Sequence, residues 1–344
     1  MTVHRLIGSP LAAIIFLVTA GTVSAQTQKE LLDELDRTIE EAESYVSAKE
    51  VRIKTIENTL HSRGVSPERQ YRIYGELFDE YQPFNYGKAV ETLDKQMEIA
   101  MLLGDKSKLN DVYLKEAMLN TAAGEFLEAR NDLARVDTTI FTKEQEIAYC
   151  NVQQRFWFDY DENLKGADKS MLRKVAYYRE HLLALADPSS SLSRYVTVRK
   201  YIDEKYFAQA DFINRHSLSR MDPASHDYAN LAYFQARICE SLNRREEMKN
   251  WFIRSAMADI KTATKDNASL FSLADALFKD GDYARAFKYS SFSLEDAIAF
   301  DAKLRQWQIS AILPAVQKSY TDIQQTHQKK TSNMLVAMYV LVFL

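Results

Sequence analysis

Glycine and proline are scarce in this sequence, which has 9 and 6 of them among 344 residues. Folds built from many short strands need turn residues at frequent intervals, so the scarcity argues against such folds. It also argues against glycine-rich phosphate-binding loops. Hydrophobic residues make up 46% of the chain and charged residues 27%, which are ordinary values for a folded globular protein. Long helices joined by short links fit this composition, and we predict an all-α fold.

A surplus of positive charge is also missing. Lys and Arg number 44 against 48 acidic residues, which gives a net charge of −4 and an isoelectric point near 6.0. Proteins that bind nucleic acids use an excess of Lys and Arg to neutralise phosphates. We therefore expect no nucleic-acid partner for this segment.

Motifs that carry catalysis or hold a cofactor are absent as well. The sequence has no H-E-x-x-H, G-x-S-x-G, Walker-type, G-x-G-x-x-G or C-x-x-C pattern. The six histidines are scattered, and carboxylate pairs among 48 acidic residues are more often a solvated face than a catalytic pair. We predict no catalytic residues, cofactor or metal site, and no enzymatic activity. An enzyme with an unrecognised site remains the third hypothesis.

The first 25 residues have the form of an export signal. His4 and Arg5 make a weakly basic start, residues 11–18 form a short apolar run, and small residues at 23–25 make a cleavage site. Removing them takes Lys and Arg from 44 to 43, so the mature charge becomes −5. We expect an exported, periplasmic protein. The alternative is a buried first helix.

Only two cysteines are present, Cys150 and Cys239. Both lie in apolar helical runs, where a free cysteine commonly serves as a small buried hydrophobe. A disulfide between them is the alternative, because export would permit it.

Residues 26–63 carry a heptad pattern with no proline and no glycine before the end of the helix. We predict one long N-terminal helix here, whose seam residues recur at alternating spacings of three and four: Leu32, Leu35, Ile39, Ala42, Val46, Lys49, Ile53, Ile56 and Leu60. Two interpretations compete. The helix caps the rest of the chain, which we favour, or it pairs with a copy of itself in a homodimer. Lys49 at a seam position favours a helix end or a partly open seam.

Two segments, 113–136 and 267–296, share a pattern of paired helices. Each has a glycine at the turn, an aromatic residue two positions later and an alanine three beyond that: Gly124, Phe126 and Ala129, then Gly281, Tyr283 and Ala286. This pattern resembles the tetratricopeptide repeat (TPR). A single helical hairpin cannot bury its own apolar face, so neighbouring hairpins must stack. We predict a TPR-like solenoid of five or six hairpins over residues 66–326. At 243–245 the turn glycine is missing, and Met248 replaces the small residue, which predicts a looser crossing there.

The TPR resemblance implies a concave groove lined by the first helix of each hairpin. A mixture of aromatic, methionine and charged residues on that face suits a peptide or protein partner. Plain packing between repeats is the alternative for each. The groove positions of the matched repeats are Asp111, Leu114, Met118, Asn230, Tyr233, Arg237, Glu240, Phe271, Asp275 and Phe278.

The last eleven residues, 334–344, form an uninterrupted apolar run after Lys329 and Lys330. As a helix they reach roughly 16 Å, about half of a hydrocarbon core roughly 30 Å thick. We expect them to begin a transmembrane helix in the inner membrane. The alternative is a buried final helix of the repeat array.

The order of these segments, with YGELFDEYQPFNYGKAVETLDKQMEIA at 74–100 and YLKEAMLNTAAGEFLEARNDL at 113–133, resembles one family of Bacteroidota proteins. That family has a TPR-like periplasmic half, one membrane span, and a cytoplasmic coiled coil leading to a DNA-binding end. Its members are regarded as transcriptional regulators or as a domain of unknown function. Relative to them the chain stops at Leu344, so the rest of the span and the DNA reader are expected only in a full-length relative.

The resemblance implies a non-enzymatic periplasmic sensor or protein-interaction module of a membrane-anchored regulator. A helical glycan-binding component of an outer-membrane uptake system is the alternative. No cysteine follows the signal's apolar run, so the lipid attachment expected of such a component is not indicated.

Overall fold

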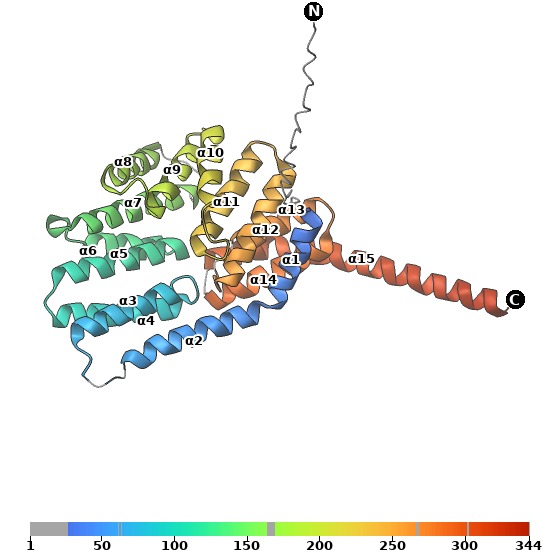
Figure 1. The fold of residues 1–344 in the computed structure, drawn as a ribbon. Helices are drawn as coiled ribbons and strands as arrows, with labels where there is room; N and C mark the ends of the chain where they lie inside the picture. The colour runs from blue at the N-terminus through green and yellow to red at the C-terminus, as the bar shows by residue number, and fades with distance from the viewer. Residues whose placement is uncertain are drawn as a thin grey trace, which may run out of the picture.

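A computed structural model describes residues 27–60, 62, 64–163, 169–265, 268–300 and 303–343. Across these residues the chain forms fifteen α-helices and one short 3-10 helix (η1, Thr138–Ile140), and no β-strand (Figure 1). The prediction of an all-α fold is confirmed. The predicted export signal lies outside the described residues.

Twelve of these helices pair into six consecutive hairpins, which stack side by side along an arc (Figure 1). This is the predicted TPR-like solenoid, at the upper end of the predicted number of hairpins. The hairpins are α3–α4 (Pro67–Tyr81, Tyr86–Leu102), α5–α6 (Lys106–Ala123, Phe126–Arg135), α7–α8 (Lys143–Asn163, Lys169–Leu185), α9–α10 (Ser191–Asp203, Phe207–Leu218), α11–α12 (His226–Ser241, Arg245–Lys261) and α13–α14 (Ala268–Lys279, Tyr283–Phe300).

Four of the turns inside the hairpins contain a residue in the left-handed conformation. Gly124 and Gly281 supply it, with φ of 83° and 85°. In the α11–α12 hairpin Asn243 takes this role with φ of 57°, since asparagine tolerates that region better than most residues. The hydroxyl of Ser255 on α12 donates to the Ala229 carbonyl of α11 at 2.7 Å. The two helices therefore cross closely, and the predicted loosening at this hairpin is wrong.

The N-terminal segment is two helices, α1 (Gln28–Glu40) and α2 (Ala42–Leu60), which corrects the prediction of one long helix. The helices meet at Glu41. α1 packs its leucines against α12, α13 and α14, whereas α2 packs Ile53 against Ile73 and Leu77 of α3. A straight helix cannot follow both surfaces, so the chain bends between them. The heptad residues Leu32, Leu35, Ala42 and Ile53 are buried within the chain, as the predicted cap requires, and the homodimer stays a prediction.

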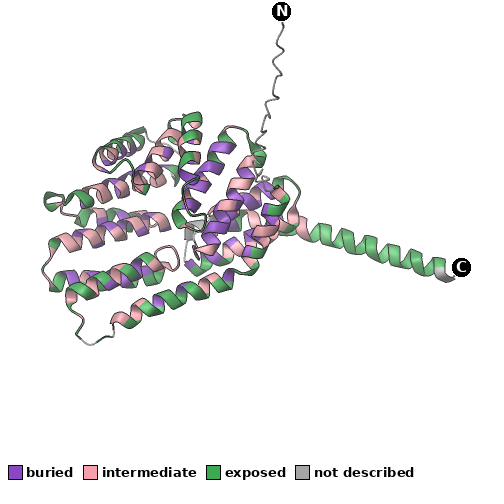
Figure 2. Cartoon of the chain, in the orientation of Figure 1, coloured by how far each residue is buried: buried purple, intermediate pink, exposed green. Residues whose placement is uncertain are grey.

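The buried apolar residues gather toward the C-terminal end of the arc (Figure 2). The largest cluster joins α1 to α11, α12, α13 and α14, and a second joins α9, α10 and α11. Cys150 and Cys239 lie in different clusters, and both are buried and free. Each acts as a small core residue, and the alternative of a disulfide between them is wrong.

The last helix, α15 (Lys303–Phe343), leaves the body as a single rod (Figure 1). Every residue from 321 to 341 is exposed (Figure 2). The alternative in which the apolar tail is buried as a final repeat helix is therefore wrong. No helix in the part of the chain described has a stretch both long and apolar enough for a membrane crossing. The beginning of a span at residues 334–344 stays a prediction.

Candidate binding site

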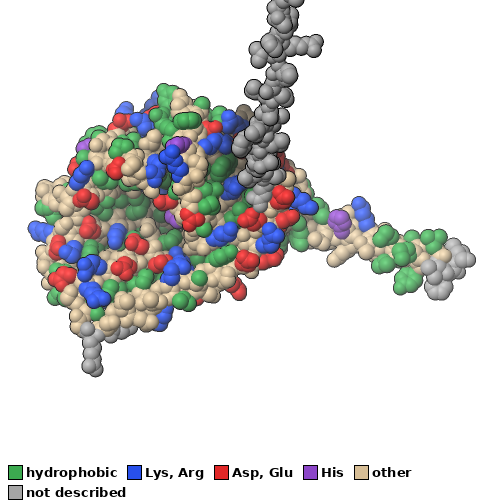
Figure 3. Space-filling view, viewed as in Figure 1, with side chains coloured by type: hydrophobic (Ala, Val, Ile, Leu, Met, Phe, Trp, Pro, Cys, Tyr) green, Lys and Arg blue, Asp and Glu red, His purple; other side chains and the backbone are tan. Residues whose placement is uncertain are grey.

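The arc of hairpins surrounds a cavity of about 1010 Å³, which we call the central cavity. Its opening is visible as a hollow in the face of the molecule (Figure 3). The first helices of five successive hairpins line it, namely α3, α5, α7, α9 and α11. The N-terminal helix α2 and the connection between α12 and α13 complete the wall. The inner surface of the solenoid is thus hollowed into a partly open site.

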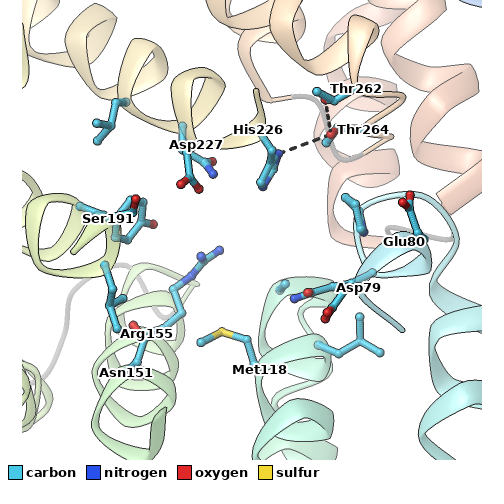
Figure 4. A pocket seen from close by; sticks show the side chains of 18 of the residues that line it. Asp79, Glu80, Met118, Asn151, Arg155, Ser191, His226, Asp227, Thr262 and Thr264 are labelled. Atoms are coloured by element: carbon cyan, nitrogen blue, oxygen red, sulfur yellow. Dashed lines mark hydrogen bonds between the residues drawn. The ribbon is translucent and has the colours of Figure 1, made fainter. Parts of the chain in front are cut away.

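The lining mixes charged, amide and apolar side chains (Figure 4). Asp79 and Glu80 of α3 lie on one side, Arg155 and Asn151 of α7 lie on the other, and Met118 of α5 lies between them. Such a surface can bind backbone amides and charged groups of a ligand while its apolar parts contact hydrophobic groups.

Histidine at the rim is held by its neighbours. His226 begins α11, and its Nδ1 lies 3.4 Å from the Thr264 hydroxyl and 3.9 Å from Oδ1 of Asp259. Among the described residues no group of three His, Cys, Asp or Glu side chains converges as a metal site would require. The histidine is therefore positioned as a polar wall residue.

Burial changes the electrostatics of the acidic side. It raises the pKa of the Asp79 carboxyl, an effect that the nearby Lys115 ammonium partly offsets. Glu80 has two cationic neighbours on α2, because Lys49 Nζ and Arg52 Nε each lie 3.4 Å from its carboxylate. The negative charge of this wall is thus largely balanced by the chain itself.

Two further cavities continue the hollow along the concave side. One of about 670 Å³ shares Arg155, Tyr195 and Asn230 with the central cavity. The other, of about 610 Å³ near α13, shares Arg237 with the second. The three together make an elongated site that follows the inner helices.

Seven of the ten predicted groove residues line these cavities. The central cavity has Met118 and Asn230, and the second has Asn230, Tyr233 and Arg237. The third has Arg237, Glu240, Phe271 and Asp275. Their position is that of groove residues, and their role in binding stays a prediction.

The other three predicted residues belong to packing. Leu114 is buried in a cluster with Ala117 and Val152, and the Asp111 carboxylate accepts a hydrogen bond of 2.6 Å from Gln145 of α7. Phe278 packs edge to face against Tyr283, at 5.4 Å between ring centroids, beside the largest core cluster. The alternative of packing between repeats holds for these three.

The sequence did not predict that α2, α3, α7 and α9 contribute residues to the lining of the central cavity. The predicted groove positions lie only on α5, α11 and α13, so the other helices contribute none. One signal did exist, since Lys49 occupies an apolar position of the heptad seam. In the structure that lysine lines the central cavity.

A solenoid of helical hairpins around a concave cavity defines a TPR-type protein, a class of protein-interaction modules with no catalysis of its own. More specifically, the family model of the SusR N-terminal TPR domain matches residues 39–311, so the chain belongs to that family. A search of curated proteins found no match. The family agrees with the TPR part of the resemblance noted from the sequence.

Proposed function

We propose that this protein is the periplasmic sensing module of a membrane-anchored regulator, and that it binds an extended peptide or protein segment in the central cavity. One observation carries the proposal: a single cavity touches the first helices of five successive hairpins. A ligand there contacts most of the solenoid at once. It can therefore change the curvature of the array if it binds one geometry better than another.

The size and chemistry of the hollow favour a chain-like ligand. Small-molecule sites usually measure roughly 300–1000 Å³, and the central cavity alone is at about the top of this range. The second and third cavities extend it lengthwise. Amide side chains such as Asn151 and Asn230 can bond a peptide backbone, and the apolar parts can take its side chains.

The change in curvature would be transmitted through α15. Its described tail carries seven exposed large apolar residues between 334 and 341, directly after Lys329 and Lys330. Apolar residues preceded by lysines suit entry into a membrane surface. Together with the predicted export signal, this supports a periplasmic module tethered at the inner membrane, with a DNA-binding end in a full-length relative.

A peptide selection tests this function. The purified chain would be mixed with a pool of random ten-residue peptides with blocked ends, and retained peptides would be measured by calorimetry. We expect Asn151→Ala and Asn230→Ala to weaken a selected peptide about tenfold each, the usual value of a lost hydrogen bond in a dry site. The matched control is Phe212→Ala on α10, whose side chain is 76% exposed and lies outside the cavities. The absence of any retained peptide, or equal effects of all three variants, would contradict the proposal.

A glycan is the second candidate ligand. The amide and carboxylate side chains of the lining, beside the Tyr195 ring, are groups that also bind sugar hydroxyls. Neutral oligosaccharides in a thermal-shift assay separate the two cases, because a glycan site responds to them and a peptide site does not. An activity panel on the same preparation tests the remaining possibility of enzymatic function.

A further inference from the structure

The two ends of the arc meet beside the central cavity, at a contact that we call the seam. The backbone N–H of Lys265, after α12, donates to the Pro83 carbonyl between α3 and α4 at 2.8 Å. Phe300 at the end of α14 packs edge to face on Tyr86 at the start of α4, with ring centroids 6.4 Å apart. The solenoid is thereby closed into a ring.

Lys49 of α2 lies at the centre of the seam and is only 4% exposed. Its Nζ lies 3.4 Å from the Glu80 carboxylate of α3 and 3.4 Å from the Thr262 carbonyl after α12. It also lies 5.7 Å from the centroid of the Phe84 ring. One ammonium group therefore contacts both ends of the ring.

This joint differs from the joints between neighbouring hairpins. Those are packed by buried apolar side chains, as in the cluster of α11, α12, α13 and α14. At the seam the apolar contribution is a small cluster around Phe300, and the rest is polar. Burial lowers the pKa of the Lys49 ammonium despite the opposing effect of Glu80. The closed ring thus holds a charge that water would solvate better, and this charge opposes closure of the seam.

The N-terminal helices connect the two sides of this joint. α1 is packed on α12 and α14, where Arg285 and Lys288 both bond its Asp36, and α2 is packed on α3. The bend at Glu41 lies between these two attachments. If the two ring ends move apart, α1 moves with one end and α2 with the other. The N-terminal segment then bends at the junction of α1 and α2.

We propose that the ring opens at the seam to admit its ligand and closes over it, and that the buried Lys49 charge between the two ends favours the open state. The ligand part rests on the proposed function. The cavity wall crosses the seam, with Glu80 and Pro83 on one side and Thr262, Thr264 and Phe300 on the other. A ligand that touches both sides gains its full contact only when the seam is closed, so binding favours closure. Phe300 immediately precedes the start of α15, so closure also fixes the base of that helix.

Hydrogen exchange of the Lys265 amide tests opening without any ligand, because its bond crosses the seam. The control is the Arg244 amide, which bonds the Cys239 carbonyl at 2.8 Å inside one hairpin. In Lys49→Met the buried charge is gone and similar volume remains, and Arg52 still faces Glu80. We expect exchange at Lys265 to slow about tenfold in this variant, with Arg244 unchanged. Unchanged exchange at Lys265, as a merely space-filling lysine gives, or faster exchange, as a lysine that holds the ends together gives, would overturn the proposal.

The peptide recovered in the selection above tests coupling to the ligand in the wild-type protein. At saturation we expect Lys265 exchange to slow at least tenfold, with Arg244 again unchanged. A peptide that binds without changing Lys265 would overturn the seam proposal and leave the proposed function intact. If no peptide binds, the proposed function fails alone, because the exchange of wild-type and Lys49→Met protein still decides whether the seam opens.

Discussion

The C-terminal block, formed by α1 and α11–α14, and the N-terminal half, formed by α3–α6, share one repeat architecture but are stabilised differently. The block holds the largest cluster of buried apolar residues, including leucines from α1 and α13. The N-terminal half has small apolar clusters. It also carries half-buried ionisable side chains on α5. The same fold thus removes more apolar area from water at one end and buries poorly solvated charges at the other.

Helix α5 carries half-buried ionisable side chains of the N-terminal half. Lys115 Nζ lies over the Phe78 ring at 5.1 Å, and burial lowers the pKa of its ammonium. Next to it, burial and the nearby Asp132 raise the pKa of Glu116 to about 7, although Arg135 lies 3.3 Å away. Charges that are disfavoured by their surroundings make the N-terminal half sensitive to pH.

The largest effect is expected from removing apolar volume in the C-terminal block. Leu35→Ala deletes a fully buried side chain of α1. Loss of contact and the cavity left behind should cost about 3 kcal/mol of unfolding free energy. Denaturant unfolding measures it, with Leu127→Ala as control because that side chain is 65% exposed in the N-terminal half. A cost below that of the control would mean that α1 is not part of the core.

A medium effect is expected from Glu116→Gln in the N-terminal half. In the folded protein Glu116 has a pKa of about 7 and holds its proton up to that pH, whereas in the unfolded chain its pKa is the ordinary value of 4.5. The folded state binds more protons in between, so the wild type loses stability as pH rises from 4.5 to 7. The variant should therefore be more stable by about 2 kcal/mol at pH 8 and equal at pH 4. Unfolding curves at both pH values measure this. A difference in unfolding free energy that does not change with pH would contradict the raised pKa of Glu116.

The contact of Asp36 on α1 with α14 should respond to pH with the opposite sign, and more weakly. Burial alone would raise the pKa of Asp36, but hydrogen bonds from Lys288 and Arg285 outweigh it and hold the pKa below its usual value. A lowered carboxyl pKa stabilises the fold above the unfolded value and is lost as pH falls through the folded one. Asp36→Asn should cost about 1 kcal/mol at pH 7 and nothing near pH 2. A larger cost in acid than at neutral pH would contradict this assignment.

Much of the fold could be predicted from the sequence, because it follows from local signals. The turn glycines at 124 and 281 and the apolar spacing around them depend only on nearby residues. The break at Glu41 could not be predicted from local signals. A heptad pattern fixes which side of a helix is apolar, but not whether the surface on which the helix packs is straight. Here two partner surfaces from distant parts of the chain impose the bend.

The binding site was predictable only in part, for a related reason. Met118 and Asn230 follow from their place on first helices, whereas closure of the ring depends on Lys265 meeting Pro83, 182 positions earlier. No local pattern encodes that contact. The sequence shows Lys49 as a charge at an apolar heptad position, yet its partners Glu80 and Thr262 come from both ends of the array. Such long-range polar contacts leave little periodic signal.

The smallest effect is expected at a turn between the two regions, where neither core packing nor charge contributes. Lys205 joins α9 to α10 with φ of 62°, and its side chain is exposed. In this conformation a residue other than glycine costs about 1 kcal/mol. Glycine removes that cost, but part of the gain is lost because glycine raises the conformational entropy of the unfolded chain. Lys205→Gly should therefore raise the unfolding free energy by about 0.5 kcal/mol. Lys205→Ala is the matched control, because alanine keeps the Cβ atom and should gain nothing. Equal gains in both variants would show that the lysine charge, and not the backbone conformation, sets the stability of this turn.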